Sequence, residues 1–172
     1  MSGEIRPTPC PTRRQALALA AGVVALARPT SAAAQTTDVD QLERLLALEQ
    51  RLQSVYEAAL ERDVIEPGLG ETLLDHERDH VRGLELALRA RGGRSPRATV
   101  PPPQAGTAFA SRPAFARFAI DLEAETVTAY QEALATLRNT RLLLPLGSIM
   151  TSGAQHIVAL RQAAGEELLA PG

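Results

Sequence analysis

The sequence LEQRLQSVYEAAL at residues 48–60 returns in altered form at residues 122–134 as LEAETVTAYQEAL. The leucine-glutamate pair, the tyrosine and the alanine-leucine pair are identical, and these two tyrosines are the only ones in the chain. Each copy is followed by a helix-like segment with a histidine, His80 in one and His156 in the other. The repeat therefore predicts a duplicated helix pair about a pseudo-twofold axis. Glu49 is then expected to face Glu123, and His80 to face His156, across the centre.

Apolar residues at three- and four-residue spacings predict helices in both copies and predict no strand. Asp38 or Asp40 can cap the first helix, and Pro67-Gly68 interrupts the chain before the second. Gly165 is able to end the last helix early. We expect an all-α fold with four helices, at about residues 39–62, 69–90, 113–137 and 142–169.

The segment between the second and third helices is long and rich in proline, glycine, serine and alanine, at residues 92–113. A helix of about 22 residues is roughly 33 Å long, and about 20 extended residues can span that length. The two helices it joins can then run parallel to each other. The sequence therefore predicts a four-helix bundle with a long crossover between helices 2 and 3.

Residues 1–34 have the features of an export signal. Arg13-Arg14 precede an apolar run at residues 16–27, and the small residues Ala32–Ala34 suit a cleavage site. The twin arginines resemble the signal of the Tat pathway, with a Sec-type signal as the alternative. The apolar run is too short for an ordinary membrane span, and no other run is expected to be long enough.

This interpretation places a mature domain at residues 35–172, beginning at Gln35. We expect it to be exported to the periplasm, the cell envelope or the extracellular medium, after contact with the export machinery. The sequence leaves open whether the signal is cleaved or retained as an anchor. The mature domain is expected to be soluble, and a homo-oligomer is compatible with the sequence.

Composition excludes several classes of function. The only cysteine, Cys10, lies in the predicted signal, so the mature domain has no disulfide or thiolate site. The chain has no lysine, and the part after residue 34 carries 14 arginines against 19 acids, a formal charge of −5. The arginines are scattered among acids, so no basic patch for nucleic acid is expected.

Ionisable side chains on the predicted inner faces are the candidate functional residues. Burying a carboxylate without a partner is costly, so such a cluster requires an explanation. Glu77 and His80 are three residues apart, which places them side by side on one helix. Such a pair can bind one metal ion together, and iron and manganese accept mixed carboxylate and imidazole ligands. The predicted inner faces carry all three histidines and three glutamates: His76, His80, His156, Glu49, Glu77 and Glu123. The candidate ligands among them are Glu49, Glu77, His80, Glu123 and His156.

The repeated glutamates and the Glu-x-x-His pair resemble the ferritin-like superfamily, over residues 38–168, and in particular the ferritin-like domains of exported bacterial proteins. That resemblance implies a glutamate on helices 1 and 3 and Glu-x-x-His on helices 2 and 4. The chain departs from this pattern at Gly153, where the fourth-helix glutamate is expected. The resemblance also implies that one or two ions of iron or manganese bind at Glu49, Glu77, His80, Glu123 and His156.

Two alternatives stay open at this point. The glutamates and histidines can satisfy one another as a buried polar network in a metal-free bundle, acting as a structural or interaction module of the envelope. Residues 76–80 also spell His-Glu-x-x-His, a zinc-protease motif, but such a site needs a third ligand and a strand edge for substrate. His76 is either a substitute ligand or a residue at the edge of the core. The sequence assigns no reaction.

Overall fold

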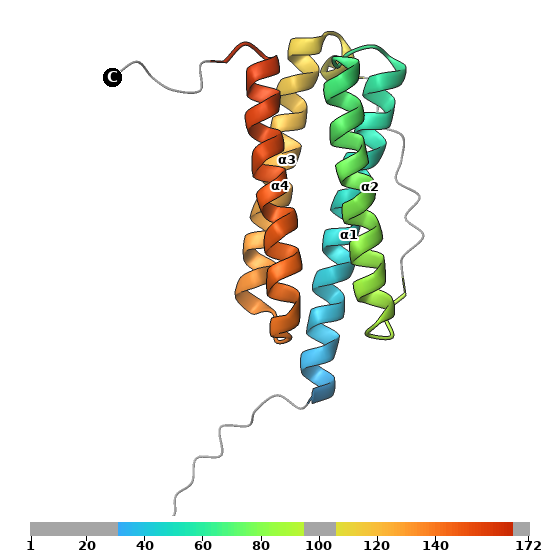
Figure 1. Ribbon diagram of the computed structural model, residues 1–172, viewed down its shortest axis with the longest axis vertical. Helices are drawn as coiled ribbons and strands as arrows, with labels where there is room; N and C mark the ends of the chain where they lie inside the picture. The colour runs from blue at the N-terminus through green and yellow to red at the C-terminus, as the bar shows by residue number, and fades with distance from the viewer. Residues whose placement is uncertain (1–30, 95–105, 167–172) are drawn as a thin grey trace, which may run out of the picture.

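The computed structural model describes residues 31–94 and 106–166 of the chain, which form a four-helix bundle (Figure 1). The helices are α1 (Ser31–Glu61), α2 (Pro67–Arg89), α3 (Arg112–Thr136) and α4 (Leu143–Ala163). Short 3₁₀ helices precede α3 and α4, η1 at Thr107–Phe109 and η2 at Thr140–Leu142. No strand occurs in the described residues. The all-α prediction is confirmed, and the strand edge that a zinc protease would need is missing from this part of the chain.

The four helices form two antiparallel pairs, α1 with α2 and α3 with α4. In Figure 1, α2 ends at the lower end of the bundle while α3 begins at the upper end, so α2 and α3 run in the same direction. The expected single crossover is therefore confirmed. Its residues 95–105 lie outside the described part of the chain.

The helix ends differ from the sequence prediction for identifiable reasons. α1 begins at Ser31, so the predicted cleavage point after residue 34 lies in its first turns, and residues 1–30 of the predicted signal lie outside the described ranges. Asp38 does not cap α1: it lies within the helix, and its carboxylate accepts hydrogen bonds from the backbone N–H groups of Arg138 (2.8 Å) and Asn139 (3.0 Å). It therefore fixes the α3–α4 connection to α1.

Pro67 begins α2 instead of breaking the chain, because the first helical turn does not need its missing N–H. The Glu66 carboxylate caps this helix by accepting from the N–H groups of Gly68 (3.0 Å) and Leu69 (2.6 Å). α4 ends at Ala163, not at residue 169, because Gly165 turns the backbone at φ +76°.

The prediction that no second apolar run is long enough for a membrane span is wrong for α4. The stretch Thr140–Ala163 is long and apolar enough to cross a membrane by length and composition, although we expected no second such run. The reason is that residues 142–160 contain no Asp, Glu, Lys or Arg. In the bundle, α4 buries Leu146, His156 and Leu160 against the other helices.

The core consists of two apolar layers with a polar layer between them. One layer includes Tyr56, Leu52 and Phe115. The other includes Tyr130 and Leu84. Both layers exclude water, so they seal the polar residues at the middle of the bundle from both ends.

Candidate metal centre

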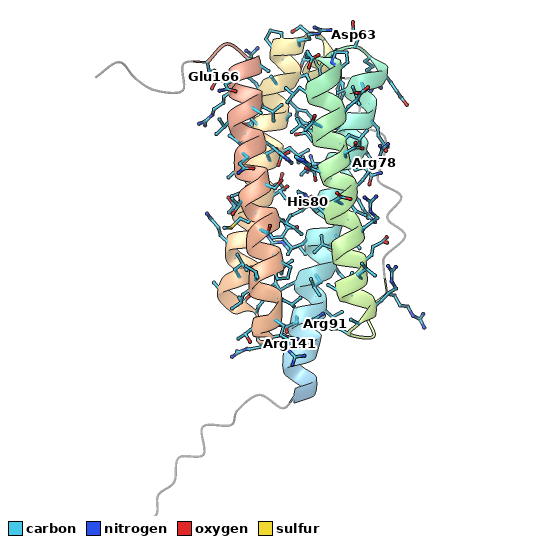
Figure 2. All side chains as sticks on the ribbon, viewed as in Figure 1. Asp63, Arg78, His80, Arg91, Arg141 and Glu166 are labelled. Atoms are coloured by element: carbon cyan, nitrogen blue, oxygen red, sulfur yellow. The ribbon has the colours of Figure 1, made fainter. Side chains whose placement is uncertain are left out.

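The five predicted site residues meet in the middle of the bundle. Glu49 comes from α1, Glu77 and His80 from α2, Glu123 from α3 and His156 from α4. The three glutamates are each 1% exposed and His156 is 3% exposed. Figure 2 shows His80 at mid-height, far from Asp63 at one end and Arg141 at the other.

Glu77 lies between the two histidines. Its Oε1 is 3.1 Å from Nδ1 of His156, and its Oε2 is 3.5 Å from Nδ1 of His80. The two outer glutamates each contact the histidine of their own helix pair. Glu49 Oε2 is 3.2 Å from His80 Nδ1, and Glu123 Oε1 is 3.1 Å from His156 Nδ1. Both histidines therefore turn the same nitrogen, Nδ1, toward the carboxylates.

The two tyrosines connect the repeats to each other. Tyr56 donates to Oε1 of Glu123 (2.6 Å), and Tyr130 donates to Oε1 of Glu49 (2.7 Å). Each tyrosine thus holds the glutamate of the opposite repeat. These cross-bonds and the His80–His156 ring separation of 6.1 Å confirm the predicted pseudo-twofold arrangement.

The sequence did not identify the tyrosines as partners of the glutamates. They entered the sequence prediction only as identical positions of the repeat. The 74-residue repeat was the available signal, since it copies glutamate and tyrosine together.

Burial and mutual contact shift the protonation of the whole cluster. Burial raises the pKa of Glu49 to about 8, assisted by the neighbouring Glu77. Burial alone would also raise the pKa of Glu77, but contacts with Glu49 and both histidines outweigh it and lower the pKa to about 2. Burial raises the pKa of Glu123 as well.

The pKa values of both histidines move the other way. Burial alone would lower them, yet hydrogen bonding to the carboxylates raises the pKa of His80 and of His156 to about 9. Burial holds the pKa of both tyrosines well above 10, so they remain donors. At neutral pH the metal-free cluster thus carries protons on Glu49, His80 and His156 while Glu77 is ionised.

The donor atoms of the cluster fit a metal ion. Two groups each place their ligand atoms within 4.8 Å of one another: Glu49, Glu77 and His80 in one, and Glu77, Glu123 and His156 in the other. Glu77 Oε2 is buried and has no hydrogen-bond partner among the described residues. Buried polar atoms are nearly always satisfied, so an orphaned carboxylate oxygen amid imidazole nitrogens is consistent with an ion as its partner.

Gly153 leaves the cluster one carboxylate short of the ferritin-like pattern. A Cβ at this position would lie 3.2 Å from Val127 Cγ2 and 3.3 Å from Glu123 Oε2, so the glycine allows α3 and α4 to approach closely. A small cavity of about 10 Å³ adjoins Gly153, lined by the three glutamates, His80 and Tyr130. That is space for about one water molecule.

His76 does not belong to either ligand group. The prediction that it faces inward is wrong, because it lies about 100° around the helix from the buried Glu77 and is exposed on α2. Its Nδ1 is 3.0 Å from His156 Nε2, the nitrogen that faces away from the carboxylates. Burial lowers the pKa of His76, and the neighbouring His156 adds to this effect. The substitute-ligand role raised by the sequence therefore does not match its position, which is outside the buried cluster.

Comparisons with known proteins agree with the four-helix fold. The family described as "Ferritin-like domain" matches residues 37–166. A conserved hypothetical protein from Mycobacterium tuberculosis has a similar structure, with a TM-score of 0.66 at 19% identity, covering 81% of this chain and 98% of that one. Ferritin-like, diiron-carboxylate proteins from Bacillus anthracis str. Ames are also similar, with a TM-score of 0.64 at 18% identity, covering 76% and 97% of the two chains. No match was found among curated proteins.

Proposed function

The chain belongs to the ferritin-like domain family, and on that premise we propose that it is an exported protein that binds iron or manganese at the centre of its bundle. The ligands are Glu49, Glu77, His80, Glu123 and His156. One of the solved structures it resembles is described as a diiron-carboxylate protein. A bound ion of this kind would supply Lewis-acid or redox chemistry in a water-excluded site.

The observation that carries the proposal is the position of Glu77. Its carboxylate belongs to both ligand groups, and its Oε2 has no hydrogen-bond partner within the described ranges. In the metal-free cluster the histidine nitrogen facing this oxygen, Nδ1 of His80, is 3.5 Å away, which is long for a hydrogen bond. An ion in either group would contact it.

The ligand inventory allows one ion or two. Each group offers two carboxylates and one imidazole, so each can hold an ion on its own. If both groups were filled with divalent ions, three glutamates would leave one positive charge, which a bound anion would have to offset. The number of ions bound per chain therefore shows whether the site can hold two ions without a glutamate at position 153.

The surrounding residues orient the ligands and keep water out. Tyr56 donates to Oε1 of Glu123 and Tyr130 donates to Oε1 of Glu49, so the Oε2 atom of each glutamate has no bond to a tyrosine. The apolar layers on both sides exclude solvent, so electrostatic contacts in the site are stronger than they would be in water.

Metal analysis tests the proposal directly. Protein purified from its native compartment, and protein reloaded with excess iron or manganese under reducing conditions, is expected to contain one or two ions per chain. A His80→Ala/His156→Ala double variant is expected to lose them, because it removes the imidazole of each group. Absence of metal from the unaltered protein under both conditions would overturn the proposal.

Export is the second part of the proposal and rests on Arg13-Arg14 and the apolar run after them. The Tat pathway carries folded proteins, so the metal can be bound before export. An Arg13→Lys/Arg14→Lys variant is then expected to stay inside the cell. Normal secretion of this variant would favour the Sec route.

A metal-free structural module is the competing function. It is favoured by the hydrogen bonds and ion pairs that the site residues make with one another, and by exposed leucines on α4, Leu143 (40% exposed) and Leu144 (84% exposed). Self-association through such a face is compatible with this alternative. The same metal analysis separates the two functions.

A further inference from the structure

The buried site needs a path by which an ion can reach it. Glu49, Glu77 and Glu123 are each 1% exposed, and the apolar layers close the bundle at both ends. An ion must therefore arrive between helices. A contact between a buried ligand and an exposed side chain would mark such a path.

His80 has the more exposed side chain of the two histidine ligands, 12% against 4% for His156, but His156 is the one that contacts an exposed histidine. Its Nδ1 faces the carboxylates of Glu77 and Glu123, so its Nε2 points away from them. That outer nitrogen is 3.0 Å from Nδ1 of His76 and 3.3 Å from the hydroxyl of Ser152. His76 is exposed, so a chain of two imidazoles connects the surface with the carboxylates.

The three histidine rings are arranged in a stack. The rings of His76 and His156 have centroids 5.3 Å apart and planes inclined by 11°. On the other side, the rings of His156 and His80 have centroids 6.1 Å apart and planes inclined by 22°. One imidazole after another thus leads from the exposed face of α2 into the ligand cluster.

An open groove of about 640 Å³ on the surface of α4 reaches the outer end of this stack at His76. His76 lines it, together with two leucines and five small or polar residues of α4: Leu143, Leu144, Gly147, Ser148, Thr151, Ser152 and Gln155. None of the lining residues is charged, and His76 is the only one of them with an imidazole. Because imidazole prefers transition metals over Mg²⁺ and Ca²⁺, the groove is suited to select the ions that the site takes.

We propose that His76 is the loading ligand of the buried site: a divalent transition-metal ion in the groove binds the His76 imidazole first and passes from it to the ligand cluster. This inference rests on the proposed metal binding. His76 has no place in the final ligand set, so its role is kinetic. Removing it should slow binding and release by the same factor and leave the dissociation constant unchanged, because that constant is the ratio of the two rates.

The experiment uses Co²⁺ as an optical probe with the metal-free full-length protein, measuring uptake by rapid mixing and release into a chelator. His76→Phe keeps an aromatic ring for stacking but has no nitrogen to bind metal. We expect it to slow uptake and release by the same factor, so that their ratio, the Co²⁺ dissociation constant, is unchanged. His76→Asp supplies another metal-binding side chain and is expected to restore the rates.

Two further variants control the test. Gln155→Ala alters the same groove without removing an imidazole and is expected to load as the unaltered protein does. Gly147→Leu fills the groove where an added Cβ meets nothing within 4 Å, so the bundle tolerates it, and loading should slow although His76 is intact.

The alternatives give different results. If His76 only positioned His156, its replacement would weaken Co²⁺ affinity and change the final absorption spectrum, and this outcome overturns the loading role. Unchanged rates in His76→Phe overturn it as well, while the metal site itself stands. Failure of the unaltered protein to bind Co²⁺ would overturn the metal site, and the loading role with it.

Discussion

Replacing Glu77 by glutamine removes the one carboxylate shared by both ligand groups while keeping the size of the side chain. In the metal-free protein this carboxylate lies beside the charged rings of His80 and His156. A pKa lowered from 4.5 to about 2 corresponds to about 3 kcal/mol of preference for the charged form. Removing one partner of a buried ion pair typically costs about 3–5 kcal/mol. We therefore expect Glu77→Gln to lower the free energy of unfolding by about 3 kcal/mol.

Thermal unfolding, followed by circular dichroism with and without Mn²⁺, measures this effect and the effect on metal binding together. In a domain of this size, 3 kcal/mol corresponds to a fall in Tm of about 10 °C. At a free metal concentration 100 times its Kd, binding stabilises the unaltered protein by about 2.7 kcal/mol. The variant should gain much less from the metal, because both ligand groups have lost the negative charge of their shared carboxylate.

Glu71→Gln is the matched control, since Glu71 is an exposed glutamate of the same helix. It should melt as the unaltered protein does and respond equally to Mn²⁺. The reasoning would be refuted if metal-free Glu77→Gln melted where the unaltered protein melts. If the variant were less stable but still gained its full increment from Mn²⁺, Glu77 would belong to the polar network and not to the metal site.

Three other predictions follow from the geometry. Tyr130→Phe should lower stability by about 1–3 kcal/mol, because it leaves the buried Oε1 of Glu49 without its donor, and a urea titration will measure it. Gly147→Ala should gain up to about 1 kcal/mol of stability from helix propensity. Gly153→Ala should gain less, because only the Cβ at Gly153 meets neighbours at 3.2–3.3 Å. The pKa of His80 and of His156 is about 9 in the fold and 6.5 ordinarily, so between these pH values the folded metal-free protein holds protons that the unfolded chain has released. Its stability should therefore fall from pH 6.5 to 9, by up to about 1.4 kcal/mol per pH unit for each proton.

Each of these has a contrary outcome. An unchanged urea midpoint for the tyrosine variant would mean that its glutamate finds another donor. Equal gains for the two glycine variants would mean that α3 and α4 separate freely at this point. Melting temperatures of metal-free protein that rise between pH 6.5 and 9 would contradict the protonated histidines. Added metal should itself stabilise more strongly at the higher pH, because the ions compete with protons for the same ligands.

Much of the site could be predicted from the sequence because a helix has a fixed period. Residues three, four and seven apart return to one face, so the apolar pattern predicted correctly that the three glutamates and two of the histidines point inward. It was wrong for the third, His76, which is exposed. Glu77 and His80 were paired by their spacing alone. The repeat matched Glu49 with Glu123, and the long proline-rich segment required α2 and α3 to run parallel. These features depend on one helix at a time, or on chain length.

The contacts between helices could not be predicted in this way. Asp38 has the position of a cap in the sequence, yet it binds the backbone of residues 138 and 139 some 100 residues away. The contact between His76 and His156 joins α2 to α4, and the tyrosine bonds join α1 to α3. Such contacts depend on how far the helices are rotated and shifted along their axes, which is decided by side-chain packing throughout the core.

The sequence by itself determined four helices, their order and directions, and the glutamates and histidines that line the centre, because these follow from periodicity and from the reach of the chain. The assignment of residues 1–34 as a Tat signal stays a prediction from sequence. Only the tertiary structure decided that Glu77 lies between two histidines with one oxygen unsatisfied, and that His76 connects the buried cluster with a surface groove. The physical reason is that ligand geometry and protonation depend on distances of a few ångströms between helices, which only the packed core fixes.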